Sequence, residues 1–239
     1  MDPAFARMTH QMNDERNLAT GNSWNLSTRM AVAAAVLMAL VIALGYAVTA
    51  GHFRAFDLAV SDALNMQRGV SPDWLILLMQ GISWIGGGIQ RFIIIGILTI
   101  ALWRWWGWGS ALAMGATTLV AAFMSEVLKY FFDRVRPDLV AQLDPITSPA
   151  YPSGHSNNAA VFYILFIMLV PQARHPGWQL AAAAMILLTG LSRILLGVHW
   201  PTDVIGGWMM GASFALVAGA VISFREDQKK GQFPSILAP

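Results

Sequence analysis

Long uncharged apolar runs constrain the fold of this chain more than any other feature. Three of them run from Met30 to Ala50, from Trp105 to Ser125 and from Val204 to Phe224. A helix needs roughly 20 mostly apolar residues to cross the hydrocarbon layer of a membrane. Because 56% of the 239 residues are hydrophobic and only 12% are charged, well below the charged share of a soluble domain, we predict a membrane protein.

Three further segments complete a predicted all-α fold, a six-helix transmembrane bundle. Two shorter apolar runs are Ser156–Ala173 and Pro176–Ser192. The stretch from Trp74 to Trp103 carries one charge, Arg91, and a run of three glycines that begins at Gly86. We interpret it as an interfacial or re-entrant piece up to about Gly86, followed by a span that starts near Ile89. It is the least regular of the six.

One membrane domain, residues 30–224, is expected between two cytoplasmic tails. The polar residues 1–29 are predicted to be disordered, and residues 225–239 form the second tail. Val48-Thr49-Ala50 resembles a signal-peptide cleavage site. However, the apolar run is longer than the roughly 7–15 residues of a signal core, and a polar tail precedes it, so the span is predicted to be retained. Residues 55–67 are predicted to form a short amphipathic helix on the outer, periplasmic side.

The distribution of lysine and arginine predicts the orientation. Six spans place both termini on one side, and positive residues in short loops favour the cytoplasm. That side would hold Arg7, Arg16, Arg29, Arg104, Arg174, Arg225, Lys229 and Lys230, whereas the other side would hold Arg54, Arg68, Arg91 and Arg134. Four tryptophans at one predicted turn fit an interfacial aromatic belt: Trp103, Trp105, Trp106 and Trp108.

Composition argues against several functions. The net charge is only +2 and the cations are scattered, so no nucleic-acid partner is predicted. The chain has no cysteine, which excludes disulfides and thiolate metal sites. No H-x-x-H or paired-carboxylate spacing lies near His155 or His199, and no metal site is predicted.

Three polar segments interrupt the apolar pattern, and ionisable groups next to spans are functional hypotheses by default. They are KYFFDRVRP from Lys129 to Pro137, YPSGHSNN from Tyr151 to Asn158, and SRILLGVHWPTD from Ser192 to Asp203. In the six-span arrangement each segment lies at the outer end of a predicted helix. We therefore expect the three segments to meet at the outer membrane face.

The cations of these segments suit a phosphate group. Burying Lys129, Arg136 and Arg193 without an anion would cost several kcal/mol for each charge. A doubly charged phosphate would remove that cost, and arginine donates to phosphate oxygens in a bidentate manner. Since Pro137 disfavours helical geometry at the preceding residue, Arg136 is expected to start a loop.

The second segment predicts an anion site at a helix start. Ser153 or Ser156 is a suitable N-cap, and Gly154 permits close approach of a ligand to the backbone. The free amides and the positive end of the helix dipole would attract an anion. His155 would lie at the mouth of that site.

The third segment predicts an oriented histidine. Pro201 fits the first turn of the last helix, and Asp203 lies in the same turn. The carboxylate can reach back to one ring nitrogen of His199. That bond would fix the tautomer and leave the other nitrogen free to attack.

Other polar residues receive simpler interpretations. Arg104, Arg174 and Arg225 are expected to extend towards lipid headgroups, and the same placement is an alternative for Arg134. Asp57, Asp62 and Asp73 are expected to be solvated on the outer surface. Glu126 is expected to pair with Lys129 three residues later, with an orienting role as the alternative. The Gly207-x-x-x-Gly211 pattern is expected to serve helix packing.

Together, the three segments resemble the signature of the type 2 phosphatidic acid phosphatase superfamily: KxxxxxxRP, PSGH and SRxxxxxHxxxD. Every defining position is present at the family spacing. These positions are Lys129, Arg136 and Pro137, then Pro152 to His155, then Ser192, Arg193, His199 and Asp203.

The resemblance implies a six-helix membrane fold in the inner membrane, with the site facing the periplasm and a lipid phosphate as substrate. His199 would attack phosphorus, Asp203 would orient it, and His155 would protonate the departing oxygen and later help to activate water. The phosphate would be held by Lys129, Arg136, Ser153, Gly154 and Arg193. No metal or other cofactor is implied.

Two alternatives remain on the same resemblance: a vanadate-dependent haloperoxidase, which shares the constellation, and a non-enzymatic lipid transporter or scaffold. The lipid stays open among undecaprenyl diphosphate, phosphatidylglycerol phosphate, phosphatidate and lipid A phosphates. Oligomeric state is not predicted.

Overall fold

The computed structural model describes residues 25–87 and 90–232, and within them the chain is helical, without a strand. This confirms the all-α class. The helices are α2 (Leu26–Thr49), α3 (Arg54–Leu64), α4 (Asp73–Gly86), α5 (Gln90–Trp106), α6 (Trp108–Phe132), α7 (Gly154–Leu169), the 3-10 helix η1 (Pro171–Arg174), α8 (Pro176–Leu195) and α9 (Pro201–Gln232).

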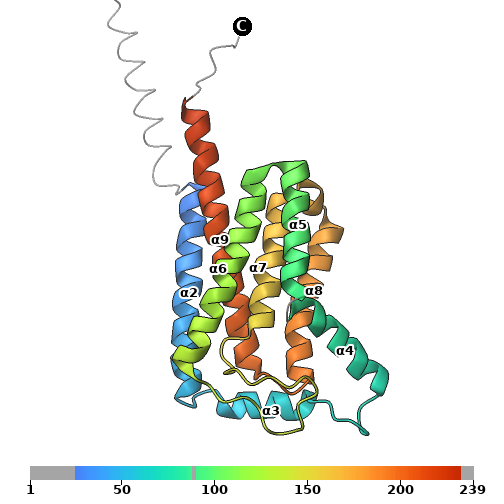
Figure 1. Ribbon diagram of the computed structural model, residues 1–239. Coiled ribbons are helices and arrows are strands. Elements are labelled where there is room, and N and C mark those ends of the chain that lie inside the picture. Colours follow the sequence, from blue (N-terminus) through green and yellow to red (C-terminus); the bar gives the residue numbers. More distant parts are fainter. Residues whose placement is uncertain (1–24, 88–89, 233–239) are drawn as a thin grey trace, which may run out of the picture.

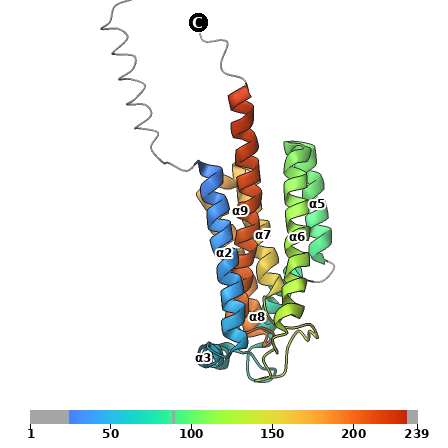
Figure 2. The ribbon, with the colours of Figure 1, turned by 90° about the vertical axis from the view of Figure 1, so that its left-hand side faces the viewer.

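An elongated bundle forms the body of the molecule. Helices α2, α5, α6, α7, α8 and α9 run along its length, and α3 lies across one end (Figures 1 and 2). Among the described residues, four helices are long and apolar enough to cross a membrane: α2, α6, α8 and α9. Helix α7 is apolar but shorter. The protein is therefore a multi-pass membrane protein, and the count of six spans stays a prediction.

The fifth candidate span is a broken one. Helices α4 and α5 together meet the same criterion, but their axes are bent by 54°, and α4 leaves the bundle at an angle (Figure 1). Helix α4 ends at Gly86, where the glycine run begins. An interfacial or re-entrant role for α4 stays a prediction.

Two helix boundaries differ from the apolar runs. Helix α2 begins at Leu26, inside the predicted tail, because the Asn25 side chain accepts hydrogen bonds from Thr28 N (2.9 Å) and Thr28 Oγ1 (2.6 Å). A capping residue thus starts the helix one turn before the apolar run. Helix α9 continues past Phe224 to Gln232. Residues 1–24 of the predicted tail lie outside the described residues.

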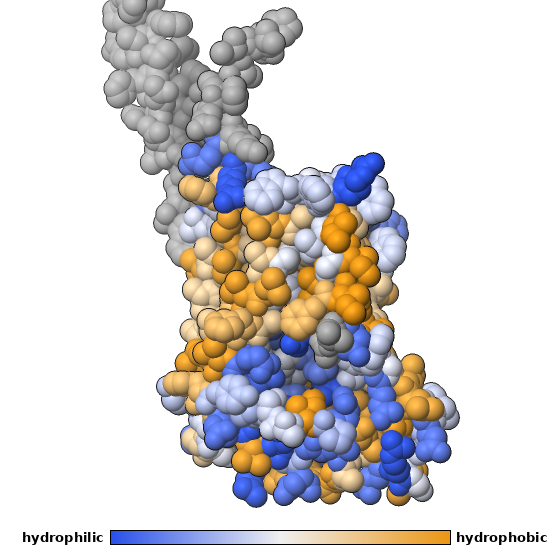
Figure 3. Space-filling model, viewed as in Figure 1, coloured by the Kyte–Doolittle hydropathy of each residue, from blue (hydrophilic) through white to orange (hydrophobic). Residues whose placement is uncertain are grey.

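The surface divides into an apolar band and a polar end. The band covers the middle of the molecule, and polar residues gather around α3 and the long loop beside it (Figure 3). At the opposite end of the bundle, α5 turns into α6 at Gly107, whose φ of +83° suits glycine. The four exposed tryptophans lie at this turn (Trp103, Trp105, Trp106 and Trp108).

Small residues bring α9 close to α7. A Cβ on Gly207 would lie 2.8 Å from Ser156 Cβ, and one on Gly211 would lie 2.7 Å from Ala160 Cβ. Both positions also abut α7 backbone atoms, which cannot move aside as a flexible side chain can. The small-xxx-small pattern therefore packs α9 against α7, as predicted, and sets the distance between two segments that carry site residues.

The loop between α6 and α7 is anchored at both ends. Before α7, Tyr151 is fully buried and its hydroxyl donates to the Val41 carbonyl in α2 (2.6 Å). Its ring meets that of Phe132 edge to face, with centroids 5.3 Å apart. Earlier in the loop, Leu143 joins a small buried cluster with Ile76 of α4 and Val198. The loop is thereby held over the end of the bundle.

We predict that Gly211→Ala destabilises the protein by about 1–3 kcal/mol, the scale for adding a methyl group to a close-packed site. Gly96→Ala in α5 is the matched control, because a Cβ there meets open space. Unfolding of both variants in detergent micelles measures the difference. Equal stability of the two variants would show that the α7–α9 contact is not close-packed.

Candidate active site

The structure brings the three polar segments together at the end of the bundle that α3 covers. The first includes the last turn of α6 and the start of the loop after it, the second starts α7, and the third joins α8 to α9. Several hydrogen bonds link them directly. Among these, Ser153 N donates to the Asp203 carbonyl (2.9 Å), and Arg136 Nη1 donates to the Val198 carbonyl (2.5 Å). Residues far apart in the sequence therefore form one site.

A buried histidine–aspartate pair occupies the turn between α8 and α9. His199 is 1% exposed and Asp203 is fully buried. Asp203 Oδ2 lies 3.4 Å from His199 Nδ1 and accepts a hydrogen bond from Trp200 N at 2.8 Å. The aspartate reaches back across the turn, as the spacing predicts.

The other ring nitrogen of His199 faces a cation. Arg136 Nη1 lies 3.2 Å from His199 Nε2. A guanidinium can only donate, so Nε2 must be the acceptor and Nδ1 carries the proton, which points to Asp203. Burial lowers the pKa of His199 well below its ordinary value, and the positive charge of Arg136 lowers it further. The imidazole is therefore neutral at neutral pH, with a lone pair on Nε2.

Arg136 is held in place by the loop that contains it. Its Nε donates to the Ser148 carbonyl (2.6 Å), and its Nη2 donates to the Pro149 carbonyl (3.2 Å). Burial lowers the pKa of Arg136 to about 10, so the guanidinium stays charged at neutral pH. Loop carbonyls thus fix a cation next to Nε2 of His199.

Arg193, near the end of α8, keeps two donors unpaired. The side chain is fully buried. Its Nη1 donates to Asp144 Oδ2 (2.6 Å) and to the Ser83 hydroxyl. Its Nε and Nη2 have no partner among the described residues. Leaving such donors unsatisfied is costly, and this edge of a guanidinium suits two oxygens of one oxyanion.

Lys129 places a third cation at the start of α7. It is 7% exposed, and its Nζ pairs with Glu126 Oε1 at 2.8 Å, the predicted ion pair. A Cβ on Gly154 would lie 3.5 Å from Nζ, so the ammonium lies against the first turn of α7. A helix start combined with a cation favours an anion.

Ser153 holds the N-cap position of α7, but its side chain does not cap the helix. Instead, its hydroxyl accepts a hydrogen bond from Ser156 Oγ at 3.1 Å. The expected capping bond is therefore absent within the described part of the chain. The first-turn amides of α7 keep no side-chain partner from these serines.

His155, in the first turn of α7, lies against the end of α4. A Cβ on Gly86 would lie 3.7 Å from His155 Cδ2, and one on Gly87 would overlap His155 Nε2. The positive charges of Arg193 and Lys129 act on this imidazole. The glycines thus let α4 approach a histidine that shares its site with His199 and the cations.

At this end of the molecule, the structure excludes the alternative placement of Arg134 and contradicts the interpretation of Asp57. Arg134 does not extend to headgroups: its side chain is 10% exposed and pairs with Asp203 and with Asp57. Asp57 is 1% exposed rather than solvated. Two buried carboxylates require a cation between them. Hydropathy could not find this pair, because the buried residues of α3 are the polar Asp57 and Ser61. Asp62 is exposed, as expected.

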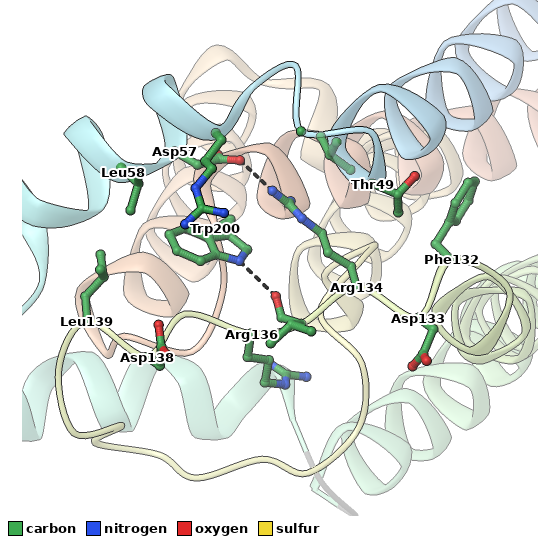
Figure 4. Close-up of a pocket in the computed structure, with 14 residues that line it drawn as sticks. Thr49, Asp57, Leu58, Phe132, Asp133, Arg134, Arg136, Asp138, Leu139 and Trp200 are labelled. Carbon is green, nitrogen blue, oxygen red and sulfur yellow. Dashed lines mark hydrogen bonds and ion pairs between the residues drawn. The ribbon is translucent and has the colours of Figure 1, made fainter.

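A cavity of about 590 Å³ lies beside this ion pair. It is bounded by the end of α2, by α3 and by the loop after α6 (Figure 4). Trp200 forms one wall, and its indole nitrogen donates to the Val135 carbonyl at 2.9 Å. Across the described residues, this cavity included, no three His, Asp or Glu side chains converge as a metal site would require; the absence of a metal requirement stays a prediction.

Fold and site together define a membrane protein in which buried cations gather near a neutral, oriented histidine. Residues 110–227 match the PAP2 superfamily. The chain belongs to this superfamily, which confirms the predicted resemblance. The relatives of the chain in this superfamily carry the names of lipid phosphatases.

Relatives and a solved structure agree. Phosphatidylglycerophosphatase B of Bacillus subtilis (strain 168) is 33% identical over 77% of this chain and 92% of its own length. An undecaprenyl-diphosphatase of Sulfolobus acidocaldarius is 32% identical over 39% of this chain and 46% of its own length. The crystal structure of a transmembrane PAP2 type phosphatidylglycerolphosphate phosphatase from Bacillus subtilis has a TM-score of 0.70 and 27% identity, covering 84% of this chain and 98% of that one. The protein is thus a PAP2-like hydrolase of a membrane lipid phosphatase family.

A histidine in water is half protonated at a pH of about 6.5. Because the pKa of His199 is lowered, we predict that its imidazole is still mostly neutral at that pH. Nitrogen-15 NMR of histidine-labelled protein, compared with His199→Asn, isolates its signal. The neutral Nδ1–H form is expected to persist as the pH falls below that midpoint. An Nε2–H form, or a doubly protonated ring at pH 7, would contradict the assignment.

Proposed function

We propose that this protein hydrolyses a phosphomonoester or diphosphate of a membrane lipid through a phosphohistidine intermediate on His199. One observation carries the proposal: Nε2 of a buried, neutral His199 faces the Arg136 guanidinium, while Nδ1 is directed to Asp203. A nucleophile with one nitrogen oriented by a carboxylate and the other facing the reacting group is the arrangement that covalent catalysis needs.

In the first step, the lone pair of His199 Nε2 attacks phosphorus. The bond between phosphorus and the leaving oxygen breaks, and His155 donates a proton to that oxygen. Arg136 turns its Nη1 from the imidazole to a phosphate oxygen, which frees Nε2. The products are phosphohistidine and the dephosphorylated lipid, or the lipid monophosphate where the substrate is a diphosphate.

In the second step, water attacks the phosphorus of phosphohistidine. His155, now neutral, takes a proton from the water. The phosphorus–Nε2 bond breaks, inorganic phosphate leaves, and His199 returns to its neutral form. Asp203 stabilises the positive charge that the ring carries while it holds the phosphoryl group.

The remaining residues stabilise the oxyanion. Arg193 offers the unpaired Nε and Nη2, and Lys129 lies beside Gly154 at the start of α7. Ser153 and the first-turn amides of α7 provide further donors. Donors fixed before the reaction stabilise charge that develops in the transition state without a cost of reorganisation.

The position of the site suits a lipid headgroup. The surface is hollowed where the apolar band meets the polar end (Figure 3), at the level where the phosphate of an embedded lipid lies. The names of the relatives point to phosphatidylglycerophosphate and undecaprenyl diphosphate as substrate classes. We further propose six spans in the inner membrane, with cytoplasmic termini and the site facing the periplasm.

Phosphate release from purified protein in detergent tests this proposal. We expect activity in EDTA on one or more of phosphatidylglycerol phosphate, phosphatidate, undecaprenyl diphosphate and lipid A phosphate. His199→Ala is expected to reduce release to background, because no nucleophile remains. The matched control is His175→Ala, an exposed histidine at the opposite end of the bundle. Full activity of His199→Ala would refute the mechanism.

The acid role of His155 makes a separate prediction. His155→Ala is expected to lower lipid hydrolysis by about 10²–10⁴-fold, the usual contribution of a general acid. The loss with p-nitrophenyl phosphate should be much smaller, since its leaving group needs no proton. Steady-state rates on both substrates provide the comparison. Equal losses would assign His155 another role.

A further inference from the structure

We propose that Asp57 and Arg134 are positioning residues: they hold the Asp203 carboxylate and, through it, the tautomer of His199. The inference rests on the proposed function, because it assigns catalytic work to His199. Helix α3 lies outside the three polar segments, and this inference gives it a part in the mechanism.

Helix α3 reaches the site through Asp57. The helix lies across the end of the bundle, next to the start of α9 (Figures 1 and 2). Asp57 Oδ1 accepts a hydrogen bond from Thr202 N at 3.0 Å. Its Oδ2 lies 2.8 Å from Thr202 Oγ1. A carboxylate from α3 therefore satisfies a free amide in the first turn of α9, next to Asp203.

Arg134 bridges the two carboxylates. Its Nη2 donates to Asp57 Oδ2 at 2.6 Å, as drawn in Figure 4. Its Nη1 donates to Asp203 Oδ1 and to Thr202 Oγ1, the latter at 2.8 Å. The face of the guanidinium is also covered by the Trp200 ring, with 5.9 Å between Cζ and the ring centroid. The side chain is therefore fixed in direction.

The bridge determines how Asp203 is turned. With Oδ1 held by Arg134, Oδ2 remains to accept from Trp200 N and to face His199 Nδ1. The Nδ1–Oδ2 distance of 3.4 Å is at the long end for a hydrogen bond. A small rotation of the carboxylate would lose it, and the proton could then move to Nε2, the nitrogen that must attack.

A phosphate-binding role does not fit Arg134. Both of its terminal nitrogens are paired with carboxylates, whereas Arg193 keeps Nε and Nη2 unpaired in the described structure. The negative charge of Asp57 offsets the positive charge of Arg134, which would otherwise be available to an anion. The pair is thus suited to hold a carboxylate in place rather than to recruit a substrate.

Asp57→Asn tests the proposal, with Asp62→Asn as the matched control, an exposed carboxylate on the same helix. The assay uses, in micelles, whichever of the four lipid phosphates in the phosphate-release test the wild type hydrolyses fastest. Asp57→Asn should lower kcat on it by about 10–100-fold, the scale for removing a group that orients a catalytic side chain, with KM nearly unchanged. Asp62→Asn should stay within about twofold of wild type.

Two readouts separate positioning from general damage. Nitrogen-15 NMR of His199 should show more of the Nε2–H tautomer in Asp57→Asn, and none of that change in Asp62→Asn. In a double-mutant cycle, Asp57→Asn should add no further loss to Arg134→Gln, because both changes break one bridge. If Asp57→Asn does not fold, Thr202→Val, which removes the shared hydroxyl, takes its place.

An unchanged kcat, a loss confined to KM, an unaltered His199 tautomer or losses that multiply in the cycle would each overturn the positioning role. These outcomes are distinct from failure of the proposed function. That failure would appear as an inactive wild type or as an active His199→Ala, whatever Asp57→Asn does.

Discussion

The cost of burying positive charge beside an apolar phase governs this end of the molecule. An unpaired ion there is destabilising by several kcal/mol, and the charge of each cation is compensated in a different way. Lys129 pairs with Glu126 and Arg134 with two aspartates. Arg136 donates to loop carbonyls. Arg193 has one carboxylate on Nη1 and leaves Nε and Nη2 unpaired among the described residues. The most incompletely satisfied cation is therefore the one best prepared for a phosphate.

Helix packing converts this electrostatic need into a defined geometry. Glycines at 207 and 211 let α9 approach α7, which brings the turn carrying His199 to the α7 start carrying His155. Tyr151 ties the intervening loop to α2 through the Val41 carbonyl. The site is thus built on helix ends that the membrane-spanning core holds fixed, which is what preorganised catalysis requires.

Sequence patterns predicted what is local and periodic. Apolar runs located the helices, and the spacing from His199 to Asp203 located the pair across one turn. The start of α2 was missed because a cap, not hydrophobicity, determines it. Asp57 was missed for a deeper reason. Its partner Arg134 is 77 residues away, and the buried face of its helix is polar. Neither the hydrophobic periodicity nor the composition of the sequence therefore predicts the contact.

The contrast between two arginines explains why residue type alone does not assign a role. Arg134 and Arg136 are neighbours in one loop and both lie near His199 or its partner. Arg134 has carboxylates on both terminal nitrogens, so a phosphate would have to displace an ion pair to reach it. Arg136 is held largely by carbonyls, which leave its charge unneutralised. The same type of side chain therefore has its charge cancelled by carboxylates at position 134, whereas at position 136 its charge stays available to an anion.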